Sequence, residues 1–250
     1  MFSWKDNVSF VLVGVREAGN IGASARAMKN MGFRNLCLVN PPEFNDEARW
    51  LAHNSLDVLK EAKHYALLAD AIDGQSLVVA VARRTGKRRG MVCPLDQGAQ
   101  RVYNIACDNK VSLLFGREDR GLYNEEVNEC GLLLTIPANK EHPSLNLSHA
   151  VAVVAYELSR VQYRREPIPD SPPLKSCRRN GLISHGELNA LYERMANIIS
   201  LLDYIPRGDR DLERQITDNL KHFISRAGLT YPELKMLHGL CSQIEINLRN

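Results

Sequence analysis

The apolar residues of this chain fall into short runs rich in β-branched side chains, separated by segments with the spacing of amphipathic helices. The runs are nearly continuous, which is typical of strands buried on both faces of a sheet. This order predicts an α/β domain with a mostly parallel sheet flanked by helices. We expect strands over 8–14, 36–40, 76–82, 111–116 and 132–137, and helices over about 21–31, 46–62, 95–107 and 122–130.

The last helix of this domain is predicted to begin within HPSLNLSHAVAVVAYEL, residues 142–158, and to end near residue 164. Its apolar positions recur every three or four residues and so share one face; they are Leu147, Val151, Val154, Leu158 and Val161. Ser144 and Asn146 precede that face, and either one could cap the helix. Because a helix needs only one cap, the second polar residue suggests a further role.

Composition changes after residue 164. The stretch YRREPIPDSPPLKSCRRNG, residues 163–181, holds four prolines and five basic residues, which indicates a basic linker. Two later tetrapeptides, SHGE and TYPE, match the Ser/Thr-x-x-Glu capping box and precede apolar-periodic segments. We therefore predict a domain over 1–164, a linker over 165–181 and a helical extension of about three helices over 182–250.

Bulk composition excludes several classes of protein. Apolar residues make up 44% and charged residues 24% of the 250 residues, as in globular proteins with a sizeable core. The six cysteines form no C-x-x-C pair, so we expect no zinc or other metal site. No apolar run approaches the roughly 18 residues of a membrane span, and Arg16 ends the first run. We expect a cytoplasmic protein, and the net charge of +3 permits a nucleic-acid partner.

The first candidate segment for chemistry is REAGNIGASARAMKNMG, residues 16–32, which follows the first strand. It is rich in glycine but lacks both G-x-G-x-x-G and the P-loop spacing. We predict that Asn20 is the N-cap of the helix and that Arg26 lies opposite its apolar face. Arg26 could be an ordinary surface charge, but the small residues around it leave room for a ligand.

Three further segments follow predicted strands, where α/β proteins bind ligands. In LLFGREDRGLYNEE, residues 113–126, two glycines flank the four charged residues 117–120; the alternative interpretation is a charged surface turn. IPANKEHPSLN, residues 136–146, delivers polar groups to a helix start. RRTGKRR, residues 83–89, has five basic residues in seven and is either a solvated loop or a contact for RNA phosphates.

Taken in order, GNIGASARAMKNMG, FGREDRGL and IPANKEHPSLNLSHAVAVVAYE resemble the three motifs of the SPOUT methyltransferases, in the TrmH-family branch of 2′-O-ribose RNA methyltransferases. The resemblance covers about residues 7–164. The ending TYPELKMLHGLCSQIE resembles the C-terminal extension of bacterial tRNA methyltransferases in that branch. The resemblance implies methylation of a tRNA ribose 2′-hydroxyl at position 32 of the anticodon loop, on cytidine or uridine.

The resemblance also implies a C-terminal trefoil knot, S-adenosylmethionine as cofactor, and a homodimer with active sites near the interface. It places the cofactor on Val81, Ala82, Arg83, Gly116, Leu122, Ile136, Ser144, Leu145 and Asn146. It places catalysis on Asn20, Arg26, Glu118, Ser144 and Asn146. We assign RNA contacts to Arg84, Lys87, Arg88, Arg89, Arg164 and Arg165, and further linker contacts to Arg178 and Arg179. Relatives often carry small or hydroxylated residues where this chain has VAVARR, so Arg83 could instead contact RNA.

Three alternatives stay open at this point. The first is an rRNA 2′-O-ribose methyltransferase of the same superfamily, although the rRNA enzymes usually carry N-terminal additions. The second is a knotted RNA-binding factor without catalysis, although every motif position that chemistry needs is occupied. A dinucleotide-dependent oxidoreductase is the third, but its glycine fingerprint is absent.

Overall fold

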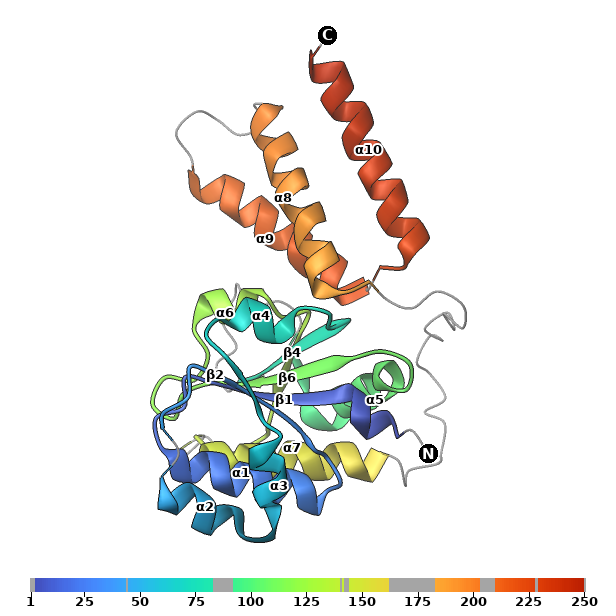
Figure 1. The fold of residues 1–250 in the computed structure, drawn as a ribbon. Coiled ribbons are helices and arrows are strands. Elements are labelled where there is room, and N and C mark those ends of the chain that lie inside the picture. Colours follow the sequence, from blue (N-terminus) through green and yellow to red (C-terminus); the bar gives the residue numbers. More distant parts are fainter. Residues whose placement is uncertain are drawn as a thin grey trace.

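A computed structural model describes residues 3–43, 45–82, 92–139, 141, 144–161, 183–202, 210–227 and 229–249 (Figure 1). Its centre is a seven-stranded sheet in the order β3-β2-β1-β6-β4-β7-β5, in which every neighbouring pair is parallel. The strands are β1 (Val8–Val13), β2 (Asn35–Val39), β3 (Lys63–Tyr65), β4 (Leu77–Val81), β5 (Val92–Pro94), β6 (Val111–Phe115) and β7 (Leu132–Thr135). Because all strands run the same way, the loops that follow them lie at one edge of the sheet.

Helices cover both faces of the sheet, which is why the central strands are apolar on both sides (Figure 1). Phe10 and Leu12 of β1 pack with the helices of one face, whereas Val11 and Val13 pack with those of the other. The first face carries α1 (Ala18–Asn30), α2 (Asp46–Ala52), α3 (Leu56–Lys60), α5 (Leu95–Ala106) and α7 (Leu147–Val161). The opposite face carries α4 (Leu68–Ile72) and α6 (Asn124–Asn128).

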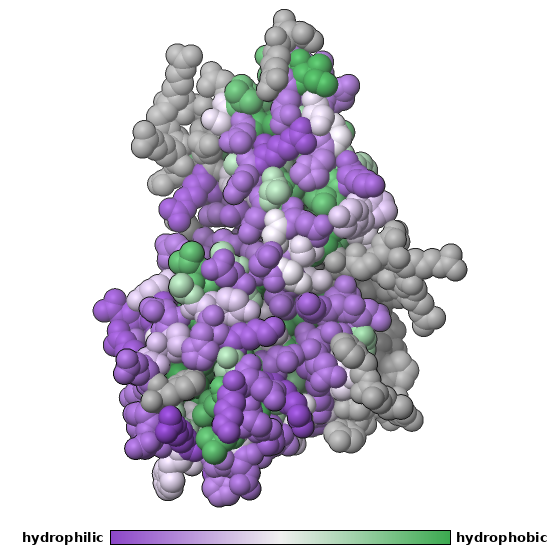
Figure 2. Space-filling view, viewed as in Figure 1, coloured by the Kyte–Doolittle hydropathy of each residue, from purple (hydrophilic) through white to green (hydrophobic). Residues whose placement is uncertain are grey.

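The C-terminal extension consists of α8 (His185–Leu201), α9 (Arg210–Ala227) and α10 (Tyr231–Arg249) and lies on the α4 and α6 side (Figure 1). Its buried apolar residues form a cluster of their own, separate from the two clusters of the sheet. The predicted capping box of SHGE is present, because Ser184 and Glu187 bond each other's backbone N–H. Figure 2 shows hydrophobic residues exposed over this extension. The exposed apolar side chains of α10 include Met236, Leu240 and Ile244.

All five predicted strands and the helical extension are confirmed, with boundaries shifted by one or two residues. The predicted helix over 46–62 is wrong as a single element: α2 ends at Ala52, a 3-10 helix (His53–Ser55) follows, and α3 begins at Leu56. The break occurs at His53, whose φ of 47° is incompatible with a continuous helix. The short elements β3, β5 and α4 were not predicted.

Two expectations concern larger organisation. The limits of the predicted linker, 165–181, lie outside the described residues. Among the residues that the structure describes, no helix combines the length and apolar composition needed to cross a bilayer.

Candidate active site

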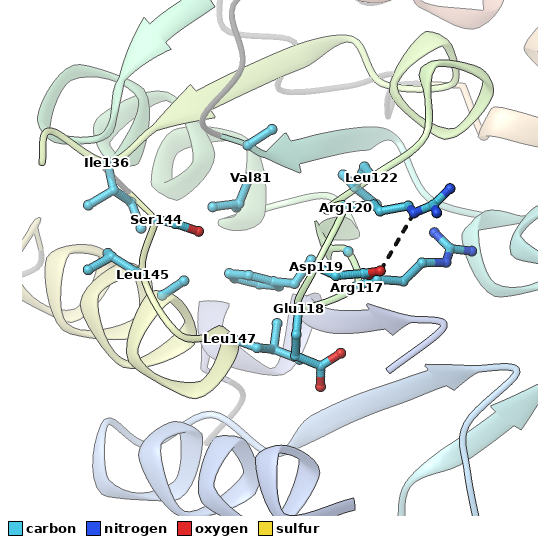
Figure 3. Close-up of a pocket in the computed structure, with 15 residues that line it drawn as sticks. Val81, Arg117, Glu118, Asp119, Arg120, Leu122, Ile136, Ser144, Leu145 and Leu147 are labelled. Carbon is cyan, nitrogen blue, oxygen red and sulfur yellow. Dashed lines mark ion pairs between the residues drawn. The ribbon is translucent and has the colours of Figure 1, made fainter. Parts of the chain in front are cut away.

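A cavity of about 150 Å³ lies at the carboxyl edge of the sheet, between the segments that follow β4, β6 and β7 (Figure 3). The first turn of α7 closes one side of it. The lining residues are Val81, Ala82, Phe115, Gly116, Arg117, Glu118, Asp119, Arg120, Gly121, Leu122, Ile136, Ser144, Leu145, Leu147 and Ala150. Seven of the nine predicted cofactor residues are in this lining: Val81, Ala82, Gly116, Leu122, Ile136, Ser144 and Leu145.

The loop after β6 folds back on itself so tightly that only glycine fits at its start. A Cβ on Gly116 would lie 2.1 Å from the carbonyl carbon of Gly121. Arg117 and Gly121 then exchange backbone hydrogen bonds of 3.2 and 2.8 Å, and Gly121 has a φ of +68°. The cavity wall is therefore a closed backbone turn with a defined shape.

Arg117 anchors this turn to α6. Its guanidinium binds Glu126 with two contacts of 3.0 Å and lies 4.0 Å above the centre of the Tyr123 ring. The side chains of Arg117 and Glu126 are both largely buried, with exposed fractions of 16% and 14%. A Cβ on Gly14 would lie 2.7 Å from Nε of Arg117, so the end of β1 also leaves space for the guanidinium. This pair could not be predicted from the sequence, because no local pattern connects residues nine positions apart.

Glu118 points away from the other charged residues of the loop and toward the start of α1 (Figure 3). Its carboxylate accepts hydrogen bonds from the backbone N–H groups of Arg16 at 3.1 Å and Glu17 at 3.3 Å, and from the Asn20 amide at 2.9 Å. Burial alone raises the pKa of Glu118, but the bonds from Asn20 and from backbone N–H groups outweigh it and lower the pKa. The carboxylate is thus held ionised.

Asn20 connects Glu118 to the start of α7. Its amide nitrogen faces Glu118, and its Oδ1 accepts a bond of 3.0 Å from the amide nitrogen of Asn146. Asn146 Oδ1 in turn accepts from the backbone N–H of Ser148 at 2.9 Å and from its hydroxyl at 2.8 Å. Asn146 therefore caps α7 and binds the first motif at the same time.

The prediction that Asn20 caps α1 is wrong. Glu17 occupies the N-cap position, and its side chain accepts no capping bond from a backbone N–H of the helix; Asn20 lies within the first turn. Asn20 is only 7% exposed because its amide bonds both Glu118 and Asn146. The Ser144 side chain points into the cavity instead of capping α7 (Figure 3).

Arg26 does not join this group. It is exposed on the side of α1 away from the core, as predicted, and is absent from the cavity lining. Within the described part of the chain it makes no hydrogen bond or ion pair. The predicted RNA contacts Arg84, Lys87, Arg88, Arg89, Arg164, Arg165, Arg178 and Arg179, and the cofactor residue Arg83, lie outside the described residues.

Exposed charges surround the cavity mouth. Asp119 binds Arg16 at 2.9 Å and Arg120 at 3.6 Å, with both arginine side chains at least 60% exposed. Such pairs contribute little to stability, so these arginines are available to an anionic ligand. No group of three or more potential metal ligands occurs among the described side chains.

The chain is similar in sequence and in fold to known proteins. A family model described as the SpoU rRNA Methylase family matches residues 7–156. The tRNA (cytidine/uridine-2′-O-)-methyltransferase TrmJ of Sodalis glossinidius is 34% identical over 248 residues, covering 96% of this chain and 91% of that protein. The crystal structure of TrmJ from Z. mobilis ZM4 superposes with a TM-score of 0.78 at 27% identity, covering 95% of this chain and 98% of that one.

A more distant structure shares the fold of the sheet domain. It is the SpoU methyltransferase AviRb from Streptomyces viridochromogenes in complex with the cofactor AdoMet, with a TM-score of 0.51 and 18% identity. The match covers 62% of this chain and 60% of AviRb.

Proposed function

This chain belongs to the SpoU rRNA methylase family, and we propose that it methylates a ribose 2′-hydroxyl in tRNA with S-adenosylmethionine as methyl donor. The observation that carries the proposal is the network of Glu118, Asn20 and Asn146 beside the cavity, which joins all three predicted motifs. The similarity to TrmJ over nearly the whole chain, extension included, supports tRNA as the substrate. The resemblance of the extension supports position 32 of the anticodon loop.

The cavity lining fits S-adenosylmethionine chemically. Val81, Leu122 and Ile136 offer apolar walls for an adenine ring, and the backbone of the turn at Gly116 offers polar groups. Asp119, whose pairs with Arg16 and Arg120 are exposed, brings a carboxylate that suits a positively charged ligand. The complex of AviRb with AdoMet, in the same fold, supports this assignment.

When bound, S-adenosylmethionine supplies a methyl group on a positively charged sulfur, ready for transfer to the 2′-hydroxyl oxygen. The protein therefore mainly orients the ribose. We assign Arg26 to the phosphate next to that ribose, because a guanidinium stays charged in proteins and binds phosphate with two parallel bonds. A phosphate oxygen or water accepts the hydroxyl proton. Glu118 and Asn20 hold residues 16–20 in place, since Glu118 contacts that segment and not Arg26.

Arg26 reaches the reaction in this proposal through a homodimer. Arg26 lies on α1 outside the cavity, and α7, which packs beside α1, exposes Val153 and Tyr156. A partner subunit packed on α1 and α7 would bring Arg26 of one chain to the cavity of the other. The trefoil knot and a cytoplasmic location belong to the same proposal, as do the RNA contacts of the basic segment 83–89.

The test is transfer of labelled methyl from S-adenosylmethionine to unmodified tRNA and to rRNA fragments, followed by mapping of the 2′-O-methyl position. Incorporation at one ribose of the tRNA anticodon loop is the expected result. Methyl incorporation into rRNA alone would contradict the tRNA assignment and identify rRNA as the substrate. Tight cofactor binding without transfer to either RNA would contradict the assignment and favour a non-catalytic RNA-binding factor.

A further inference from the structure

The carboxylate of Glu129 in the sheet domain contacts two residues of the extension. Glu129 follows α6, and its Oε2 lies 3.0 Å from Nε2 of His185, the first residue of α8. Its Oε1 lies 3.9 Å from Nζ of Lys221 in α9. His185 is largely buried, with 8% of its side chain exposed, so this contact is shielded from solvent. The bond to His185, followed by the charge of Lys221, lowers the pKa of Glu129 despite its burial.

Two neighbouring contacts fix the same junction. The backbone N–H of His185 donates to the carbonyl of Gln75 over 2.7 Å, just beyond α4. A Cβ on Gly186 would lie 2.2 Å from Oδ1 of Asp73, so the start of α8 sits close against the end of α4. The contact is specific in both position and orientation.

No shared apolar core holds the two units together among the described residues. The buried cluster of the extension contains only residues of the extension itself. The polar contacts of Glu129 and His185 are therefore the described side-chain bonds that connect the extension to the sheet domain.

The helix that precedes Glu129, α6, also anchors the cavity wall. Glu126 of α6 binds Arg117 of the turn at the cavity, and Glu129, three residues later, binds the extension. The segment of α6 and Glu129 therefore connects the extension to the wall of the cavity. A tRNA is much larger than the cavity, so it must contact surface beyond it.

We propose that Glu129, together with His185 and Lys221, is a positioning group that holds the extension in the orientation in which it and the cavity bind one tRNA. The proposal rests on the proposed tRNA methyltransferase function. Release of the extension lowers tRNA affinity but leaves the cofactor cavity and the chemical step intact.

The test compares full-length Glu129→Ala and Glu129→Gln with the control Glu125→Ala. Glu125 is an exposed residue of α6 that makes no hydrogen bond or ion pair among the described residues. We expect Glu129→Ala to raise KM for whole tRNA roughly tenfold, with kcat and cofactor affinity unchanged. Glu129→Gln keeps an oxygen acceptor for His185 and is expected to restore part of the affinity. The control is expected to behave like the natural chain.

Small-angle scattering provides a readout that needs no RNA. Glu129→Ala is expected to increase the radius of gyration, because the extension leaves the sheet domain. An unchanged radius and an unchanged KM would overturn the proposal, as would a loss of kcat without a change in KM. If the natural chain methylates no RNA, the proposed function fails; the scattering result then still decides whether Glu129 holds the extension.

Discussion

The side-chain amide of Asn146 donates a hydrogen bond of 3.0 Å to Oδ1 of Asn20, across 126 residues of sequence. Glu118 determines the direction of this bond, because an ionised carboxylate can only accept hydrogen bonds. Asn20 must turn its nitrogen to Glu118 and its oxygen to Asn146. Asn146 then has its own oxygen left for the N–H of Ser148.

Replacing Asn20 by alanine is expected to break this chain of bonds. Both Glu118 and Asn146 would lose a partner, which costs about 1–3 kcal/mol of unfolding free energy. We also expect the rate of methyl transfer to fall more than tenfold. Chemical denaturation measures the change in unfolding free energy, and initial rates measure the change in methyl transfer. The matched control is Asn30→Ala, at an exposed position of the same helix, which should change neither quantity.

Gly116→Ala is expected to close the cavity. The new Cβ would lie 2.1 Å from the Gly121 backbone, which cannot yield without opening the turn. Overpacking of this kind costs about 1–3 kcal/mol, and cofactor binding by titration calorimetry should be lost. Gly239→Ala in α10 has no atom within 4 Å of its new Cβ and should instead stabilise the chain by about 0.5–1 kcal/mol.

The lowered pKa of Glu118 predicts that the chain loses stability in acid. Its folded-state pKa is lowered, so its contribution to the unfolding free energy is fully present above the usual glutamate value of about 4.3. That contribution disappears as pH falls through the lower folded-state pKa. The difference in stability between the natural chain and Glu118→Gln should therefore be constant from about pH 7 to 5 and shrink below about pH 4. A difference that grows on acidification would contradict the assignment.

Arg26→Lys separates the proposed phosphate clamp from a simple positive charge. Arg26 is exposed and unpaired among the described residues, so stability should stay within about 0.5 kcal/mol. Lysine cannot bind phosphate with two parallel bonds, and we expect kcat to fall at least tenfold with cofactor affinity retained. Arg34→Lys, at another exposed position, is the control. Near-normal turnover of Arg26→Lys would exclude the two-bond clamp.

The central strands could be predicted from sequence because burial on both faces leaves continuous apolar runs. The strands β3 and β5 could not, because they lie at the two edges of the sheet, have three residues each and are mostly exposed. The five-residue helix α4 is likewise too short to show periodicity.

The candidate site was predicted in part. The residues that line the cavity follow strands, so motif order locates them. The orientation of Asn20 could not be predicted from its neighbours, because its partner Glu118 lies 98 residues away. The role of Arg117 was missed for a similar reason: its partner Glu126 belongs to the next helix.

The parallel sheet places β6 between β1 and β4, so the walls of the cavity come from distant parts of the chain. The hydrogen bonds of Asn20 beside the cavity span 98 and 126 residues, and contacts of such separation form slowly. During synthesis the first motif leaves the ribosome long before Asn146 exists. A nascent or truncated chain that stops short of α7 therefore cannot assemble the network, and only a completed domain holds the three motifs together.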